Sequence, residues 1–345
     1  MNPVLVNVLR GGAVESFHRG ALAIVDADGA VHTTLGDVDR PVFPRSAVKA
    51  LQALPLVASG AAEHFGLSDE QIALACASHR GEPLHAATAA AMLARAGLGE
   101  SALECGTHWP YDEAASRQLA RQRKGPGALH NNCSGKHAGF VCVGCLMALQ
   151  AGREPAEFVR GYVQPGHPVM REISAALQAA TGCDLASAPM GTDGCSIPTF
   201  GIPLRQLARG FARFGSGHGL SPTHAAATRR LRQAVAQAPF MVAGTGRFDT
   251  RVMQHFGERV FCKVGAEGVY CAALPTRGLG VAIKIDDGQG ARAAEVVMAA
   301  VIRALAQRDE ADAAVLRELV NVPLRNWNGI EVGAIAPAEG LRALS

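Results

Sequence analysis

At Phe43-Pro-Arg-Ser-Ala-Val-Lys49 the chain passes from a β-rich beginning into an apolar stretch that continues to Ala58. Pro44 suits the entry to a helix and Ser46 its first turn, because the first N–H groups of a helix have no partner within it. We predict a helix over 47–58 that Pro55 ends or bends. On such a helix the side chains of Ser46 and Lys49, three residues apart, share one face.

This pair of side chains suits a serine nucleophile and its base. A serine hydroxyl is a weak nucleophile unless a base lies within hydrogen-bonding reach. Lysine serves as that base when burial or a second cation lowers its pKa, and Val48 and Leu51 would help to bury Lys49. Ser46 at a helix start would also lie beside backbone N–H groups that suit an oxyanion. Without catalysis, Ser46 would be a helix cap and Lys49 a solvated surface lysine.

Strand patterns lie at both ends of the sequence and helical patterns lie between them. We predict strands at 4–10, 21–29, 30–36, 259–265, 268–274, 280–285 and 329–332, with a hairpin turn at 28–29. Helices are expected up to about residue 239, interrupted near 78–81, 125–136 and 188–198, with a buried helix from His137 and another helix at 291–308.

The economical packing of these elements is one central, mainly antiparallel sheet that is made from both chain ends and flanked by helices. We therefore predict an α/β (α+β) fold. A single catalytic domain would span 1–345, with a helical sub-lobe at about 50–240.

Composition restricts the class of protein. The 345 residues are 48% hydrophobic but only 5% aromatic, and the net charge is +3, so we expect no nucleic-acid partner. The N-terminus lacks a secretory pattern, and the longest uncharged apolar stretch, 138–149, is too short to cross a bilayer. The nine cysteines, an odd number, suggest reduced thiols. We expect a cytoplasmic protein that does not enter a membrane.

Two polar loops carry a second set of reactive groups. The first is His130-Asn-Asn-Cys-Ser-Gly-Lys-His137, and the second is Asp193-Gly-Cys195. Two cysteines with His137 or Asp193 nearby could bind zinc, whereas lysine is an unusual metal ligand because it must first lose a proton. Alternatively, Cys133 and Cys195 are free thiols that pack the loops, or one of them is a nucleophile.

A short motif far downstream supports the Ser-x-x-Lys interpretation. Lys263-Val-Gly265 lies on a predicted strand. Ser-x-x-Lys on a helix followed by Lys-x-Gly on a strand resembles penicillin-binding proteins, serine β-lactamases and related glutaminases. The order of strands, helices and strands resembles that fold as well. Otherwise, Lys263 is an edge-strand lysine that hinders aggregation.

Taken together, the motifs resemble the asparaginases of the Rhizobium etli type, also called class 3 or asparaginase II family enzymes. The resemblance extends from about residue 4 to about residue 335. The matching segments are Phe43-Pro-Arg-Ser46-x-x-Lys49, Cys76-Ala-Ser-His-x-Gly-Glu82, His130 to His137, Asp193-Gly-Cys195, Pro239-Phe-Met-Val-Ala-Gly244 and Lys263-Val-Gly-Ala-Glu-Gly268.

The resemblance implies the serine β-lactamase and glutaminase sandwich fold, a homodimer, and hydrolysis of L-asparagine to aspartate and ammonia. It implies two Ser–Lys pairs, Ser46 with Lys49 and Ser78 with Lys263. It places a zinc ion on Cys133, Lys136 and Cys195, with water as a fourth ligand. It places Arg45, His137 and Asp193 beside the substrate.

We therefore expect Ser46 to attack the side-chain amide while neutral Lys49 accepts its proton, with Ser78 and Lys263 relaying protons or positioning the nucleophile. The sequence leaves open whether Lys49 or Lys263 is the base. Lys49 and Lys263 would lower each other's pKa by like-charge repulsion. We expect Arg45 to bind the α-carboxylate and Asp193 the α-ammonium group. Zinc would hold the two polar loops together and shape the pocket or orient the substrate.

Two other functions remain open from the sequence. The first is another serine amidase or acyl hydrolase of this fold, such as a glutaminase, a β-lactamase, a D-Ala peptidase or an esterase. The second is a non-catalytic protein that binds zinc or asparagine.

Overall fold

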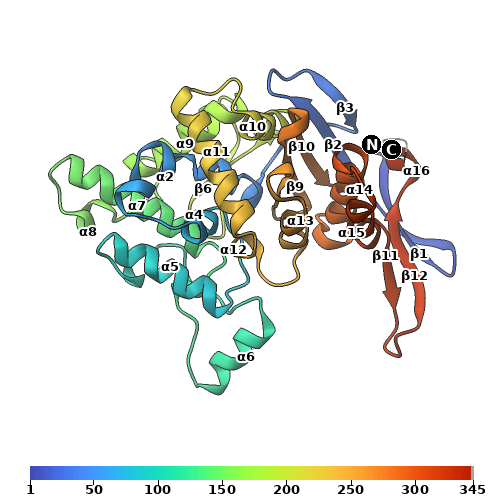
Figure 1. The fold of residues 1–345 in the computed structure, drawn as a ribbon, viewed down its shortest axis with the longest axis horizontal. Helices are drawn as coiled ribbons and strands as arrows, with labels where there is room; N and C mark the ends of the chain where they lie inside the picture. The colour runs from blue at the N-terminus through green and yellow to red at the C-terminus, as the bar shows by residue number, and fades with distance from the viewer. Residues whose placement is uncertain (343–345) are drawn as a thin grey trace.

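The computed structural model describes residues 1–342 and centres on an antiparallel sheet (Figure 1). The last three residues of the predicted domain lie outside the described part. The sheet has the order β11 (Val322–Arg325), β12 (Glu331–Pro337), β1 (Val4–Arg10), β2 (Ala13–Asp26), β10 (Leu279–Ile285), β9 (Val269–Leu274) and β8 (Phe261–Val264), and β3 (Val31–Leu35) pairs with β2. Because β1 pairs with β12, strands from both chain ends are neighbours. The predicted fold class is confirmed.

Strand β2 is longer than the sequence pattern predicts. It begins at Ala13 instead of 21, because the exposed residues 13–17 pair with β1 in a ribbon beyond the hydrophobic core. Its far end forms the predicted hairpin with β3. There the Asp26 carboxylate accepts hydrogen bonds from the backbone N–H groups of 28, 29 and 30, and Gly29 takes the positive φ of +95° that the turn requires.

Helices cover the sheet closely. Strand β9 is buried along its whole length. Helix α10 (Leu204–Ser216) packs on β2, β9 and β10, and α14 (Glu295–Ala306) packs on β1, β9 and β12. At Gly280 a Cβ atom would lie 1.9 Å from the carbonyl oxygen of Ala208, so only glycine lets α10 approach β10 this closely.

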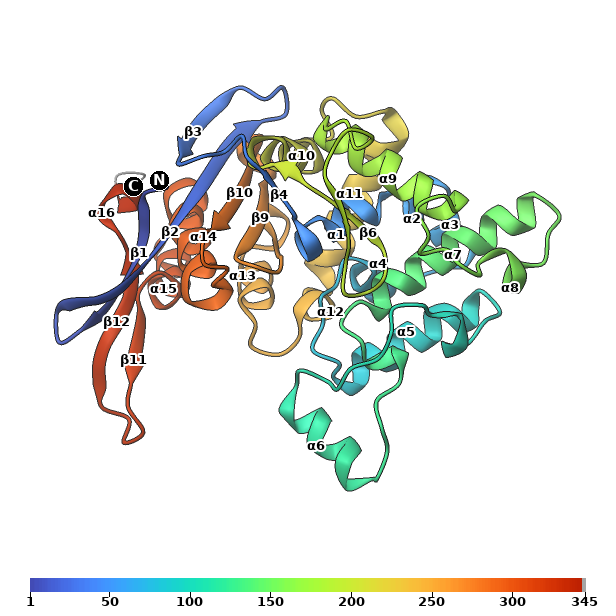
Figure 2. The same ribbon diagram turned by 180° about the vertical axis from the view of Figure 1, so that it is seen from behind.

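The other helices form a region beside the β9–β8 end of the sheet, as both views show (Figures 1 and 2). The larger helices there are α4 (Asp69–Ala75), α5 (Pro83–Arg95), α6 (Glu113–Arg121), α7 (Ser134–Gln150), α9 (Pro168–Thr181), α11 (Pro222–Gln237) and α13 (Phe248–Phe256). Two short ribbons, β4 (Pro41–Val42) with β7 (Ile202–Pro203) and β5 (Met190–Thr192) with β6 (Pro198–Phe200), join this region to the sheet.

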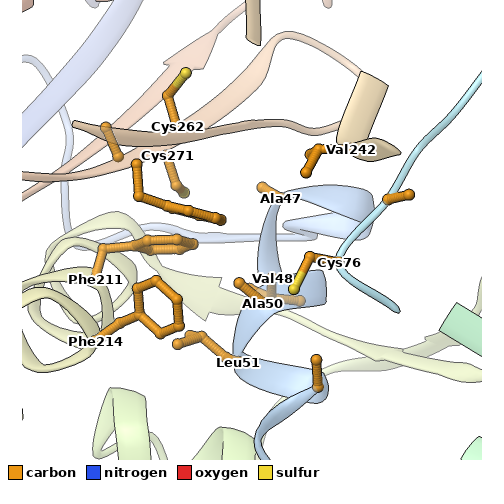
Figure 3. Packing of buried hydrophobic residues seen from close by; sticks show 14 of the residues in the cluster. Ala47, Val48, Ala50, Leu51, Cys76, Phe211, Phe214, Val242, Cys262 and Cys271 are labelled. Atoms are coloured by element: carbon orange, nitrogen blue, oxygen red, sulfur yellow. The ribbon is translucent and has the colours of Figure 1, made fainter. Parts of the chain in front are cut away.

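The predicted helix at 47–58 is three short pieces. A 3₁₀ turn at Arg45–Val48 leads into α1 (Lys49–Gln52), and α2 (Leu54–Ala58) follows with Pro55 in its first turn. The apolar face of these pieces is buried. Figure 3 shows Ala47, Val48, Ala50 and Leu51 packed among Phe211, Phe214, Cys76 and Val242. This burial fixes the backbone that carries Ser46 and Lys49.

Helix α7 begins at Ser134, three residues before the predicted start at His137. Lys136 and His137 therefore belong to the first turn of a buried helix and not to a loop. Gly135 allows this turn to press against α4, because a Cβ atom there would lie 2.4 Å from the carbonyl oxygen of Leu74. Among residues 1–342, no helix has the length and apolar character needed to span a membrane.

Candidate active site

Ser78 is the meeting point of the two predicted lysines. It follows α4, and its backbone N–H donates to the Val242 carbonyl oxygen at 2.9 Å. Its Oγ accepts one hydrogen bond from Lys49 Nζ and one from Lys263 Nζ, both at 2.9 Å. Both lysines are completely buried. The structure therefore brings three of the four predicted catalytic side chains into direct contact.

The predicted contact between Lys49 and Ser46 is not among the hydrogen bonds that Lys49 makes in the described chain, and their catalytic pairing stays a prediction. Lys49 Nζ also donates to the Ala77 carbonyl oxygen at 2.6 Å and to Cys133 Sγ at 3.1 Å. Among the described residues, the Ser46 hydroxyl has no hydrogen-bonding partner. A buried ammonium must find acceptors inside the protein, and Lys49 finds them at Ala77, Ser78 and Cys133.

Lys263 has the properties of a base near neutral pH. Its Nζ donates to the Val264 carbonyl oxygen at 2.8 Å. Burial lowers the pKa of Lys263 to about 8, and the positive charge of Lys49 contributes, as the sequence predicted. Asp249 opposes this shift. Its Oδ2 accepts from the Val264 N–H at 3.2 Å, and its buried Oδ1 has no partner within the described part of the chain.

Ser46 and Ser78 line the same cavity, which has a volume of about 340 Å³. Its lining consists of Ser46, Ser78, Arg80, Tyr111, Asn132, Arg247, Val264, Gly265 and Ala266. The end of β8 comes very close to the Ser46 turn. A Cβ atom at Gly265 would lie 2.7 Å from the Pro44 carbonyl oxygen. The Lys-x-Gly motif therefore needs its glycine for this approach.

Two backbone donors are available at this cavity. The N–H groups of Ser46 and Ala266 donate to none of the described residues. Arg45, directly before Ser46, has a φ of +50°, a left-handed conformation that is rare for residues other than glycine. Strained backbone of this kind is common at functional sites. A serine, a basic relay and free N–H groups together can support acyl transfer.

The three predicted substrate-binding residues do not line this cavity. Arg45 Nε and Asp193 Oδ1 pair with each other at 2.5 Å. Burial raises the pKa of Asp193, but the charges of Lys136 and Arg45 outweigh it and lower the pKa overall. The His137 ring is completely buried, with Nδ1 2.6 Å from the Tyr162 hydroxyl.

The predicted zinc ligands lie next to the lysines. Lys136 Nζ donates to Cys195 Sγ at 3.0 Å, and Cys133 Sγ accepts from Lys49. The neighbouring Cys195 thiol, together with Lys49 and Lys136, holds the pKa of Cys133 well below that of a free thiol despite its burial. Two sulfur atoms and an amine thus converge, and Cys133 favours the thiolate form that zinc requires. These residues fit a zinc ion.

A metal cluster without lysine does not occur here. Within residues 1–342, no group of three or more His, Cys, Asp or Glu side chains is placed to hold a metal ion. Any site at Cys133 and Cys195 would therefore depend on Lys136 as a third protein ligand.

Comparison with known proteins agrees with the sequence motifs. The family model described as L-asparaginase II matches residues 6–337. The chain belongs to the L-asparaginase II family. The family supports a hydrolase that acts on a small molecule. A β-lactamase from Mycobacterium bovis is a similar solved structure, with 16% identity and a TM-score of 0.38 over 87% of this chain and 94% of that one. No curated protein matches the sequence.

Several residues at the site of this family member are absent from the sequence predictions. They are Arg80, Tyr111, Asn132, Arg247 and the buried Asp249. The signal for two of them lies in Gly244-Thr-Gly-Arg-Phe-Asp249, a glycine-rich segment with a cation directly before a helix and an acid in its first turn. Asn132 lies inside the polar loop that the sequence singles out.

Proposed function

We propose that this chain is an L-asparaginase of the Rhizobium etli type, which hydrolyses L-asparagine to L-aspartate and ammonia. One observation carries the proposal. The Ser78 hydroxyl lies between two buried lysines and lines the same cavity as Ser46. Burying two lysines next to one hydroxyl is unfavourable unless their chemistry is used, which favours a catalytic function over a binding function.

Ser46 is the better nucleophile of the two serines. The Ser78 oxygen already accepts hydrogen bonds from two lysines, so its lone pairs are engaged. The Ser46 oxygen has no such bonds among the described residues, and its cavity is also lined by Ala266, whose backbone N–H is free like that of Ser46. Ser46 would therefore attack, and Ser78 would connect it to the lysines.

The reaction begins when Ser46 Oγ bonds to the side-chain carbonyl carbon of asparagine. Its proton passes to Ser78, whose own proton passes to neutral Lys263. The N–H groups of Ser46 and Ala266 stabilise the oxyanion. The C–N bond then breaks, and the nitrogen leaves as ammonia with the relayed proton. Water attacks the acyl-enzyme by the same route in reverse and releases aspartate.

We also propose that Cys133, Lys136 and Cys195 hold a zinc ion. The proposal is supported by the two sulfur atoms and the amine that converge there. When bound, zinc would supply a fixed positive charge that holds the two loops together. The attacking group does not come from the metal, because a serine is available. Lys49 lies between Cys133 and Ser78, so it links the loop to the proton relay.

The test is ammonia release from L-asparagine by the wild-type protein and by Ser46→Ala and Ser78→Ala. We expect Ser46→Ala to lose activity by a factor of about 10³ or more. Ser78→Ala should lose about 10² to 10⁴. Aspartate should still bind to both variants. Near-normal turnover by Ser46→Ala would overturn its assignment as nucleophile.

Other substrates separate the alternatives. Faster ammonia release from L-glutamine would favour a glutaminase. Hydrolysis of nitrocefin or of a simple ester, without ammonia release from asparagine, would favour another acyl hydrolase of this fold. Tight asparagine binding without any turnover would favour a non-catalytic binding protein.

A further inference from the structure

The cavity that holds both serines is positively charged. Arg80 and Arg247 are the charged residues of its lining, and no acidic side chain belongs to that lining within the described chain. Lys49 and Lys263 lie behind Ser78 and add to the positive potential. A cavity of this kind attracts a ligand that carries a negative charge.

Both arginines keep donors free for such a ligand. Arg80 Nη2 donates to the Tyr111 carbonyl oxygen at 2.9 Å, and its nearest carboxylate, Asp112, is 3.9 Å away. Arg247 makes no side-chain hydrogen bond to the described residues, and its nearest carboxylate, Glu295, is 3.6 Å away. A guanidinium group has five N–H donors, so most of them remain available.

The carboxylate nearest to Arg247 is a weak competitor for it. Burial raises the pKa of Glu295 to about 7, although Arg247 itself favours the charged form. Near neutral pH a large part of the Glu295 population is therefore protonated. A substrate carboxylate would meet little competition at Arg247.

Arg45 is a poorer candidate for the same task. Its guanidinium is already neutralised by Asp193 at 2.5 Å. It lines a different cavity, of about 350 Å³, together with Phe43 and Lys284. Binding a carboxylate at Arg45 would require breaking this partly buried ion pair.

The loops that carry Arg80 and Arg247 are tied to each other. Glu82 Oε1 accepts from the Thr245 N–H at 2.8 Å, and Glu82 Oε2 accepts from the Thr245 hydroxyl at 2.7 Å. Each arginine lies two residues from this tie. Gly244 permits it, with a φ of +99° and space for no Cβ atom, which would lie 2.4 Å from Glu82 Oε1. The two segments that carry the arginines are thus held together, and both arginines line the cavity.

We propose that Arg80 and Arg247 together bind the α-carboxylate of the substrate and restrict the site to amides that carry a free carboxylate. This inference rests on the proposed function, because the amide must lie at Ser46 for the carboxylate to reach these arginines. Two arginines can bind the two oxygens of a carboxylate with charge-assisted hydrogen bonds. Glu82 is a positioning residue for both.

The experiment compares L-asparagine with 3-aminopropanamide, which keeps the amide and the amine but lacks the carboxylate. We expect Arg80→Met and Arg247→Met each to raise KM for asparagine on the order of 10- to 100-fold, with little change in kcat. Their kinetics with 3-aminopropanamide should match those of the wild-type protein. Arg247→Lys should recover part of the loss, and Arg171→Met, at an exposed position on α9, is the matched control.

Equal losses with both substrates would show a structural role and overturn the proposal. Unchanged kinetics with asparagine in both variants would overturn it as well. If only Arg45→Met lost activity, and only with asparagine, Arg45 would be the residue that binds the α-carboxylate, and the proposal would be overturned. If the wild-type protein releases no ammonia, the proposed function fails, and calorimetric binding of L-aspartate still tests the arginines. Weaker aspartate binding by both arginine variants would support carboxylate binding by Arg80 and Arg247. An absence of aspartate binding by the wild-type protein would overturn this role.

Discussion

Lys263 should govern the pH dependence of turnover. Only its neutral amine can accept a proton, and burial lowers its pKa to about 8. The neutral fraction grows as the pH rises, so kcat should increase by about tenfold per pH unit below this value and level off above it. A pH–rate profile with asparagine measures this rise, which is the acidic limb of the profile. A rate that falls between pH 6 and 8 would contradict the assignment of Lys263 as base.

Asp249 should set the position of that limb. Its negative charge favours the protonated form of Lys263, so Asp249→Asn should move the limb to lower pH. The pH–rate profile of the variant gives the shift directly. Asp28→Asn, which alters an exposed carboxylate that pairs with His218, is the control and should leave the limb in place. A shift to higher pH would exclude this role for Asp249.

At the scale of residues, the sequence located the reactive groups and the contact of Ser78 with Lys263, but not the hydrogen-bonding partners of Lys49. Lys49 reaches Ala77, Ser78 and Cys133, which lie 28, 29 and 84 positions along the chain. A spacing rule such as i and i+3 reports which side chains share a helix face. It does not report which residues the rest of the fold places opposite that face. The direction of a buried ammonium group depends on those residues, because they supply its hydrogen-bond acceptors.

At the scale of elements, the contact between α10 and β10 offers a test of stability. Gly280→Ala would place a Cβ atom 1.9 Å from the Ala208 carbonyl oxygen, so the helix must move away from the sheet. We expect a loss of at least about 1–3 kcal/mol in the free energy of unfolding, measured by denaturant titration. Gly99→Ala is the matched control, because nothing lies within 4 Å of its Cβ position. A loss of similar size in both variants would contradict this explanation.

The start of α7 and the loop of Cys195 should be joined by zinc. Metal analysis of the purified protein should find zinc, and the Cys195→Ala variant should contain none. The control is Cys271→Ala, which alters a buried cysteine of β9 and should retain the zinc. A strong chelator should lower the melting temperature and weaken activity only in part. Total loss of activity that zinc restores, in a protein that stays folded, would instead indicate a directly catalytic metal.

Elements with strong patterns are predicted well, and elements defined by tertiary packing are not. The strands β8, β9 and β10 match their predicted ranges within a few residues. The sequence predictions omit β11 and α15 (Glu310–Val320), and β11 is half exposed with a weak apolar pattern. Its strand conformation follows from pairing with β12, which no local pattern shows.

At the scale of the whole molecule, the site needs both parts of the fold. Ser46 and Ser78 come from the helical region, whereas Lys263 comes from the sheet. We therefore propose that the chain acts as one catalytic domain with a helical sub-lobe at about 50–240. We also propose the homodimer that the sequence motifs suggest. Light scattering should give about twice the 35.8 kDa of one chain. A mass of one chain, with full activity, would contradict it.

The pairing of β1 with β12 has a consequence for how the protein is made. Strand β1, near the start of this sequence, has one of its two neighbours in β12, more than 300 residues later, and the two strands lie side by side (Figure 1). Its other neighbour, β2, is itself paired to the late strand β10. Strands β1, β2 and β3 can pair with one another early, but one edge of β1 and one edge of β2 lack their partner strands until β12 and β10 are made. These open edges are exposed to chaperones and to self-association in the meantime.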